Sequence, residues 1–305
     1  MRAARLTSPG TPLTGVAGGA DPVVLVAHGS RDPRAADATR ALARAVSAAR
    51  PGTPVWASWL DHTEPGPTEV LRELAVAGHR RAVLVPLLLT AAYHNRVDIP
   101  AAVAAATQAG PPLAVRVTDV LGPADDTPDP ALLAGLCRRL GETRPGGLDA
   151  LRSGGSDALR SGGSDALRSG GLDALRPGGL DALRSGGFDA LVLAAAGTRD
   201  ARARRSVGRV ADALGVEFGV PCRVAYASAA PPAAGVAVSR LRASGARRVA
   251  VSAYFLAPGL FHDAVVEAAG AAGAVAVAAP LTDAPELVEL VLRRVDERPV
   301  SASTG

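Results

Sequence analysis

Two histidines in the N-terminal half of the chain follow apolar runs that end abruptly. His28 comes directly after VVLVA (residues 23–27), and His94 comes shortly after RAVLVPLLL (residues 81–89). Such runs are typical of strands buried on both faces of a parallel sheet, and ligands of these sheets bind beyond the carboxyl ends of the strands. The two imidazoles are therefore expected at one sheet edge, where they would suit a divalent first-row metal ion.

A third group of polar residues follows another short apolar run. Asp61, His62 and Glu64 lie in the stretch WLDHTEP and are expected at the same sheet edge. Each also has an ordinary structural explanation: Asp61 and His62 suit a turn, Glu64 suits a helix start, and His94 suits a hydrogen bond to a backbone carbonyl. The joint placement of His28, His94 and Asp61 after three strands favours a functional site.

The segments around these residues alternate between two kinds. Strands are expected at 23–27, 55–60, 81–89 and 113–120, and helices at 35–49, 69–78, after Pro100 and at 130–140. Strands that alternate with helices predict crossover connections and a parallel sheet. The expected fold class is α/β, with a parallel four-stranded sheet flanked by helices.

The same organisation recurs in the C-terminal half. The stretch LVLAAAGTRD (residues 191–200) matches VLVAHGSRD (residues 24–32) in its glycine, hydroxyl residue, arginine and aspartate, but Ala196 stands where His28 stands. Further strands are expected at 223–229, 248–256 and 274–279, with a closing helix at 285–297. The chain is therefore predicted to contain two tandem domains of one fold, with the first histidine only in the first.

An array of short repeats separates the two halves. The unit Gly-Gly-x-Asp-Ala-Leu-Arg, where x is Leu or Ser, recurs every eight residues, and glycine pairs at this spacing disfavour a continuous helix. The array is interpreted as a flexible linker. The expected organisation is a disordered leader (1–20), an N-terminal domain (21–140), the linker (141–187), a C-terminal domain (188–298) and a tail (299–305).

Composition narrows the class of protein. The 305 residues carry a net charge of +4 and two cysteines, without a C-x-x-C pattern. Scattered arginines argue against nucleic acid as a partner, and no apolar run is long enough for a membrane helix. Two distant cysteines fit a reducing compartment, so a cytoplasmic location is expected.

The stretches AHGSRDP (residues 27–33) and PLLLTAAYHNRVDIP (residues 86–100) together resemble the sirohydrochlorin chelatase group of class II chelatases, in its two-module form. The resemblance implies that His28 and His94 bind the metal and act in catalysis. The family's carboxylate after the second strand falls on Asp61. Residues beside these positions are expected to meet the carboxylates of the substrate: Ser30, Arg31, Glu64, Tyr93 and Arg96.

The resemblance implies insertion of Fe²⁺ or Co²⁺, as metal substrate, into sirohydrochlorin, with no tightly bound cofactor. The absence of His-rich tracts and of a C-x-x-C motif favours iron and sirohaem biosynthesis over cobalt and cobalamin biosynthesis. The expected state is a monomer with an internal pseudo-dimer. The alternatives are a cobaltochelatase and a non-catalytic metal- or tetrapyrrole-binding protein. A histidine phosphatase would need arginine at Ala27, and a dinucleotide-binding domain would need G-x-G-x-x-G.

Overall fold

The computed structural model describes residues 20–91, 94–108, 110–123, 127–143 and 187–297. The chain forms two compact units, one of Met1–Asp125 with Thr282–Gly305 and the other of Asp126–Leu281. Within the described ranges, no helix is both long and apolar enough to cross a bilayer. The expected leader, most of the expected linker and the tail lie outside the described residues.

The first unit, called unit 1, is built on a parallel sheet with the order β2-β1-β3-β4. Its elements are β1 (Val23–Ala27), α1 (Pro33–Ala49), β2 (Val55–Trp59), α2 (Pro67–Val76), β3 (Arg81–Leu87), the π-helical turn η1 (His94–Asp98), α3 (Ile99–Thr107), β4 (Ala114–Val117) and α10 (Pro285–Asp296). Because β1 pairs in parallel with both β2 and β3, the carboxyl ends of all three strands meet at one edge.

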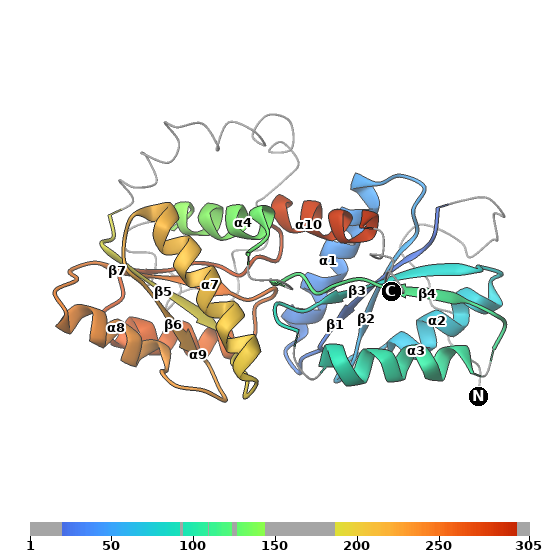
Figure 1. Ribbon diagram of the computed structural model, residues 1–305, viewed down its shortest axis with the longest axis horizontal. Coiled ribbons are helices and arrows are strands. Elements are labelled where there is room, and N and C mark those ends of the chain that lie inside the picture. The colour runs from blue at the N-terminus through green and yellow to red at the C-terminus, as the bar shows by residue number, and fades with distance from the viewer. Residues whose placement is uncertain (1–19, 92–93, 109, 124–126, 144–186, 298–305) are drawn as a thin grey trace, which may run out of the picture. The chain divides into compact units, whose positions relative to one another are not determined.

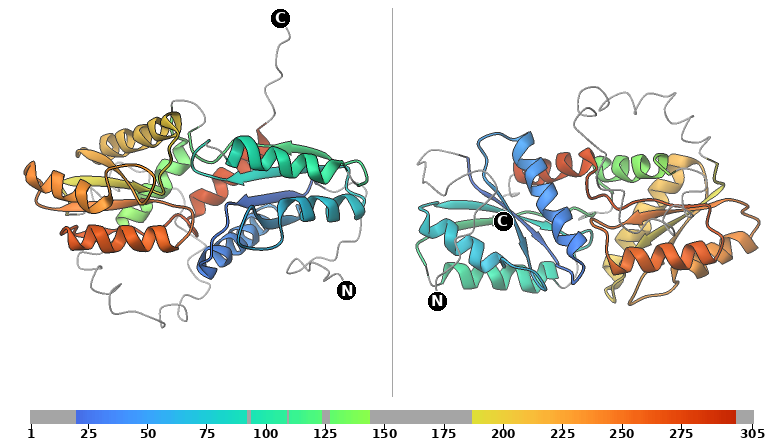
Figure 2. Two further views of the ribbon diagram at one scale, coloured as in Figure 1. Left: turned by 90° about the horizontal axis from the view of Figure 1, so that it is seen from below. Right: turned by 180° about the vertical axis from the view of Figure 1, so that it is seen from behind.

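Helices cover both faces of each sheet, as Figure 2 shows for both units. In unit 1, Val24 and Val26 of β1 belong to one buried cluster with Leu71 of α2 and Ile99 of α3. Helix α1 contacts β1 and β2, and α10 contacts α1 and β3. The loops after β1 and β3 therefore lead to opposite faces, and the carboxyl edge between them is the usual ligand position in such sheets.

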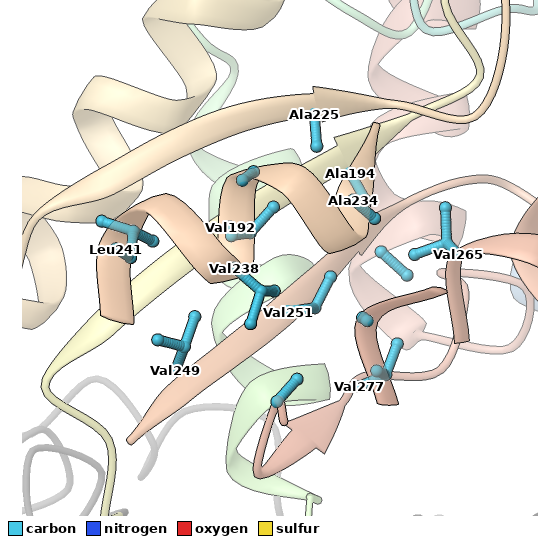
Figure 3. Packing of buried hydrophobic residues seen from close by; sticks show 14 of the residues in the cluster. Val192, Ala194, Ala225, Ala234, Val238, Leu241, Val249, Val251, Val265 and Val277 are labelled. Atoms are coloured by element: carbon cyan, nitrogen blue, oxygen red, sulfur yellow. The ribbon is translucent and has the colours of Figure 1, made fainter. Parts of the chain in front are cut away.

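The second unit, called unit 2, repeats this plan with the strand order β6-β5-β7-β8 (Figure 1). Its elements are α4 (Pro130–Gly141), β5 (Ala190–Ala195), α7 (Ala201–Phe218), β6 (Cys222–Tyr226), α8 (Ala234–Ala243), β7 (Val249–Tyr254), α9 (Leu260–Ala271) and β8 (Ala276–Val277). Val192 and Val251 of the sheet pack with Val238 of α8 and Val265 of α9 (Figure 3). The predicted fold class, with two parallel four-stranded sheets flanked by helices, is confirmed.

The two units do not coincide with the two sequence modules. Helix α4 follows β4 in sequence but contacts β7 and α7 of unit 2, whereas α10 follows β8 in sequence but contacts α1 and β3 of unit 1. Each module therefore gives its last helix to the sheet of the other module. The domain limits expected from the sequence, 21–140 and 188–298, follow the repeat, whereas the compact units follow the packing of these helices.

The turn that leaves β1 begins helix α1 with an aspartate cap. The Asp32 carboxylate accepts a hydrogen bond from the Arg34 backbone N–H at 3.0 Å and pairs with the Arg34 guanidinium at 2.5 Å. The side-chain hydrogen bond from Arg34 lowers the pKa of Asp32 below its usual value. The cap fixes the direction in which α1 leaves the site edge.

Asp32→Ala is expected to lower the free energy of unfolding of unit 1 by about 1 kcal/mol at neutral pH, because the cap is lost. Since the folded pKa of Asp32 is depressed, its contribution is present above the unfolded carboxyl pKa of about 3.9 and is lost as pH falls through the folded pKa. Urea unfolding at neutral and acidic pH measures the deficit, which should shrink in acid.

Asp37→Ala is the matched control, because Asp37 has a 78% exposed side chain that only pairs with Arg40 on the helix surface. Such exposed pairs contribute roughly 0–1 kcal/mol. A deficit for Asp32→Ala that keeps its full size in acid would contradict the assignment.

Candidate functional site

The loops after β1 and β2 stay joined beyond the ends of the strands. The Leu60 N–H donates to the Ala27 carbonyl at 3.0 Å, and the Asp61 N–H donates to the His28 carbonyl at 3.0 Å. This continuation of the parallel ladder holds His28 and Asp61 side by side at the carboxyl edge. Both residues are exposed, so the edge presents an imidazole and a carboxylate to solvent.

Gly29 makes this close approach possible. Its φ is +99°, and a Cβ added there would lie 1.8 Å from the Asp61 carbonyl oxygen. Any other residue would therefore combine a strained backbone with a direct clash against the neighbouring loop. The glycine of the His-Gly pair is required by the contact between the loops that carry His28 and Asp61.

Asp61 is paired with His62, which the sequence placed at the same edge and for which it also offered the role of a turn residue. The His62 backbone N–H donates to one Asp61 carboxylate oxygen at 2.8 Å, and His62 Nε2 lies 3.3 Å from the other. The backbone of His62 has a φ of +60°, which turns its side chain back toward Asp61. The sequence does not predict this pairing, because it depends on the positive φ of His62. A positive φ is usually signalled by a glycine, and this position has none.

His94 begins the π-helical turn η1 directly before α3. Single π-helical turns are rare and are often found at functional sites. The start of the loop between β3 and η1 is bonded to the segment after β4, where the Leu121 N–H donates to the Leu88 carbonyl at 2.9 Å. His94 thus follows in sequence the end of β3, the strand that pairs with β1. The side chain of His94 and the whole of Tyr93 lie outside the described residues.

Of the other residues predicted to contact the substrate, some already make hydrogen bonds within their own turn and one does not. The Ser30 hydroxyl accepts a hydrogen bond from the Asp32 N–H at 3.1 Å, and the Arg96 guanidinium donates to the Ala91 carbonyl at 2.9 Å. Arg31 is exposed, and within the described part of the chain it has no ion pair; Arg34 takes the Asp32 carboxylate instead. Arg31 is thus the cation at this turn that local structure leaves available.

An open groove runs along the loop after β2. Its volume is about 930 Å³, and its walls include Asp61, His62 and Glu64 together with Glu69 and Arg72 of helix α2. Glu64 is exposed on this wall. The groove gives water and small ions access to the Asp61–His62 pair from the side of the loop.

Unit 2 contains the same loops without their ionisable groups. The Ser228 N–H donates to the Ala196 carbonyl at 2.9 Å, as Asp61 does to His28, and Gly197 has a φ of +103° with its Cβ position 1.9 Å from the Ser228 carbonyl oxygen. Ala229 has a φ of +59°, matching His62. The backbone of the edge therefore forms with alanine and serine, and folding does not require His28, Asp61 or His62.

The two cysteines offer no alternative metal ligands. Both are free and lie in separate elements, and burial raises the pKa of each thiol to about 12. Among the side chains that the structure describes, no three His, Cys, Asp or Glu residues gather into a metal-binding group. His262 is occupied locally, with Nε2 3.2 Å from the Ala278 carbonyl oxygen.

Comparisons with known proteins agree with the repeated architecture. The family model described as CbiX matches residues 22–142 and again residues 190–298. No curated protein matches the sequence.

Solved structures share the fold at low sequence identity. SirB from Bacillus subtilis with Fe³⁺ has a TM-score of 0.66 at 17% identity, covering 90% of this chain and 94% of that one. SirB from Bacillus subtilis subspecies spizizenii in complex with cobalt has a TM-score of 0.63 at 16% identity, covering 90% and 93%. CbiX, described as the terminal enzyme for biosynthesis of siroheme in denitrifying bacteria, has a TM-score of 0.54 at 17% identity, covering 90% and 98%.

Gly29→Ala is expected to lower the free energy of unfolding of unit 1 by roughly 2–5 kcal/mol, because strain and a backbone clash add. Gly197→Ala should do the same to unit 2. Gly52→Ala separates the two causes, because Gly52 has a φ of +84° but nothing within 4 Å of its Cβ position. Its cost should be only about 1 kcal/mol. Equal losses for Gly29→Ala and Gly52→Ala in denaturant unfolding would refute the clash.

Proposed function

The chain belongs to the CbiX family, and from that premise we propose that it is a sirohydrochlorin chelatase, which inserts a divalent metal ion into sirohydrochlorin. The SirB structures that share its fold hold Fe³⁺ and cobalt, which supports a metal ion as one of the two substrates. The tetrapyrrole is the other substrate, and no resident cofactor takes part.

The observation that carries the proposal is the contrast between the two sheet edges. Both units build the same turn and the same strand-end hydrogen bonds, but only unit 1 carries His28, Asp61 and His62 there. Since alanine and serine form the edge equally well in unit 2, the ionisable groups of unit 1 serve chemistry and not folding.

Metal insertion needs groups that bind an ion weakly and then take up protons. Two pyrrole N–H protons leave the macrocycle as the divalent ion enters, so the net exchange is one ion for two protons. His28 and His94, at the ends of neighbouring strands, would hold the incoming ion through neutral imidazole nitrogens. Each imidazole that releases the ion regains a lone pair and can accept a proton. An open site suits an ion that has to be transferred.

Asp61 and His62 form a second proton-accepting group beside the first. The Asp61 carboxylate lies 3.3 Å from His62 Nε2, so the two groups could pass a proton between them. The open groove beside this pair would then release the proton to solvent. We assign proton removal to this pair. Arg31 and Glu64, on the neighbouring loops, would contact the substrate.

We propose Fe²⁺ as the preferred metal, and sirohaem as the product, because the chain lacks the His-rich tracts and C-x-x-C motif of some cobalt-inserting relatives. Co²⁺ insertion for cobalamin is the second candidate, supported by the cobalt-bound structure that shares the fold. The two modules would let one chain act as a monomer with an internal pseudo-dimer. The unpaired cysteines support a cytoplasmic location.

His28→Ala is expected to lower the rate of metal insertion by about 10²–10⁴-fold, because it removes a metal ligand and a base. The variant copies Ala196, so unit 1 should unfold at the same denaturant concentration. The visible spectrum of sirohydrochlorin follows insertion of Fe²⁺ and of Co²⁺ in anaerobic buffer. His79→Ala is the control, since His79 precedes β3 at the opposite edge. Equal rates for the parent and His28→Ala would exclude the chelatase assignment, whereas tight binding without turnover in the parent would favour a carrier protein.

The double variant Asp61→Ser with His62→Ala rebuilds the unit 2 loop in unit 1. Because Ser228 and Ala229 keep the same backbone, we expect unchanged unfolding of unit 1 but a fall in kcat of roughly 10–100-fold. Asp61→Glu should retain more activity than Asp61→Ser. An unchanged kcat in the double variant would show that the pair takes no part in proton removal.

A further inference from the structure

The loops after β3 and β4 of unit 1 are joined beyond the ends of their strands, as the loops after β1 and β2 are. The Leu121 N–H donates to the Leu88 carbonyl at 2.9 Å, and the Gly122 N–H donates to the same carbonyl at 3.3 Å. Leu88 is the first residue after β3, at the start of the loop that leads to His94. The segment after β4 therefore supports the beginning of that loop.

The two segments also approach each other closely at the next residue. A Cβ added at Gly122 would lie 1.9 Å from the Leu89 carbonyl oxygen. Val120 and Leu121, which precede this contact, are buried. Since a close-packed interior transmits displacement, a shift of the segment after β4 would also shift the loop after β3.

The segment after β4 is held by an arginine from the last helix of the chain. Arg294 of α10 donates from Nε to the Val120 carbonyl at 3.0 Å and from Nη1 to the Glu297 carboxylate at 2.6 Å. A buried backbone carbonyl needs a hydrogen-bond donor, and a charged donor forms the stronger bond. Arg294 thus fixes the segment that supports Leu88.

A second arginine anchors α10 to β4 from the opposite direction. Arg116 of β4 donates to the Glu297 carbonyl at 3.0 Å and also to the Val295 carbonyl. These carbonyls belong to the carboxyl end of α10, where a helix leaves carbonyls without donors and favours a cation. Movement of Arg294 away from Val120 would therefore strain these bonds as well.

Unit 2 has a matching arginine beside an edge that lacks the site groups. The stretches RRLGE (residues 138–142) and RRVDE (residues 293–297) close α4 and α10. Arg139 pairs with Glu142 at 2.8 Å in the same way, and its side chain is 11% exposed, against 10% for Arg294. The two arginines thus have similar burial and the same kind of carboxylate partner.

We propose that Arg294 is a positioning residue for the metal site, because it holds the segment after β4, which in turn holds the start of the loop to His94. The proposal rests on the proposed chelatase function. It gives a residue of the second sequence module a role in the chemistry of the first. Arg294 acts through the backbone, without contact to the metal ion or the tetrapyrrole.

Loss of the guanidinium would leave the Val120 carbonyl buried without this donor. The segment after β4 would then move, and the loop from Leu88 onward would follow it. An ion that is held by ligands from two different loops is sensitive to such a shift, because groups behind the ligands set their orientation. Metal binding should therefore weaken.

The test is a titration of the full-length protein with Co²⁺ alone, followed by the visible absorbance of the bound ion. Arg294→Met keeps a long side chain but removes its donors, and it is expected to raise the Kd for Co²⁺ by about three- to tenfold. It should lower kcat for insertion with little change in the KM for sirohydrochlorin. Arg294→Lys keeps a cation and should recover part of the affinity, and it provides the measurement if Arg294→Met does not fold.

Arg139→Met is the matched control, because it removes an equally buried arginine beside the edge without the first histidine. Both methionine variants should unfold at lower denaturant concentration than the parent, whereas only Arg294→Met should weaken Co²⁺ binding. Amide hydrogen exchange at Leu121 and Gly122, measured where every variant is folded, should become faster in Arg294→Met and stay unchanged in Arg139→Met.

The outcomes separate this inference from the function on which it rests. If Arg294→Met binds Co²⁺ as tightly as the parent while His28→Ala loses binding, the metal site stands and the role of Arg294 is overturned. Equal weakening by Arg294→Met and Arg139→Met would also overturn it, because a general loss of stability would then explain the effect. If the parent neither binds Co²⁺ nor metallates sirohydrochlorin, the chelatase function is overturned together with the inference. Weaker binding in Arg294→Met with parent-like binding in Arg139→Met confirms the positioning role.

Discussion

The site depends on the close approach of two backbone segments beyond the ends of β1 and β2. Because the Asp61 N–H bonds to the His28 carbonyl, the ladder of the sheet continues into the loops and sets the spacing of the groups that they carry. This approach is possible only if the residue after His28 has no Cβ, which Gly29 satisfies. The proposed site thus rests on the sheet of unit 1, although its side chains stand on loops.

Much of this arrangement follows from the sequence. Apolar runs between turn residues identified β1 with both its limits and placed His28, Asp61 and His94 at one edge, because parallel strands end together. The Asp61–His62 pair was not predictable, since it depends on a positive φ at a histidine, and such a φ leaves no trace in composition. The role of Ser30 in its own turn became clear only when its bond to the Asp32 N–H was seen.

The packing of α4 and α10 could not be predicted from the sequence, for a different reason. Each helix has an apolar stripe suited to either of two similar sheets, so periodicity reveals that the helix packs but not on which sheet. The duplication that created the second module made the two destinations nearly equivalent. The two copies share the backbone of the edge but differ in its side chains, which are His, Asp and His in one and Ala, Ser and Ala in the other.

The placement of the two closing helices ties the halves of the chain together in a way that a simple tandem fusion would not. Unit 1 is completed by residues from the end of the chain, and unit 2 by residues that precede β5 in sequence. Neither half, expressed alone as a module, would carry the helix that covers its own sheet. A chain cut between α4 and β5 would therefore yield two fragments, each of which carries the helix that covers the sheet of the other.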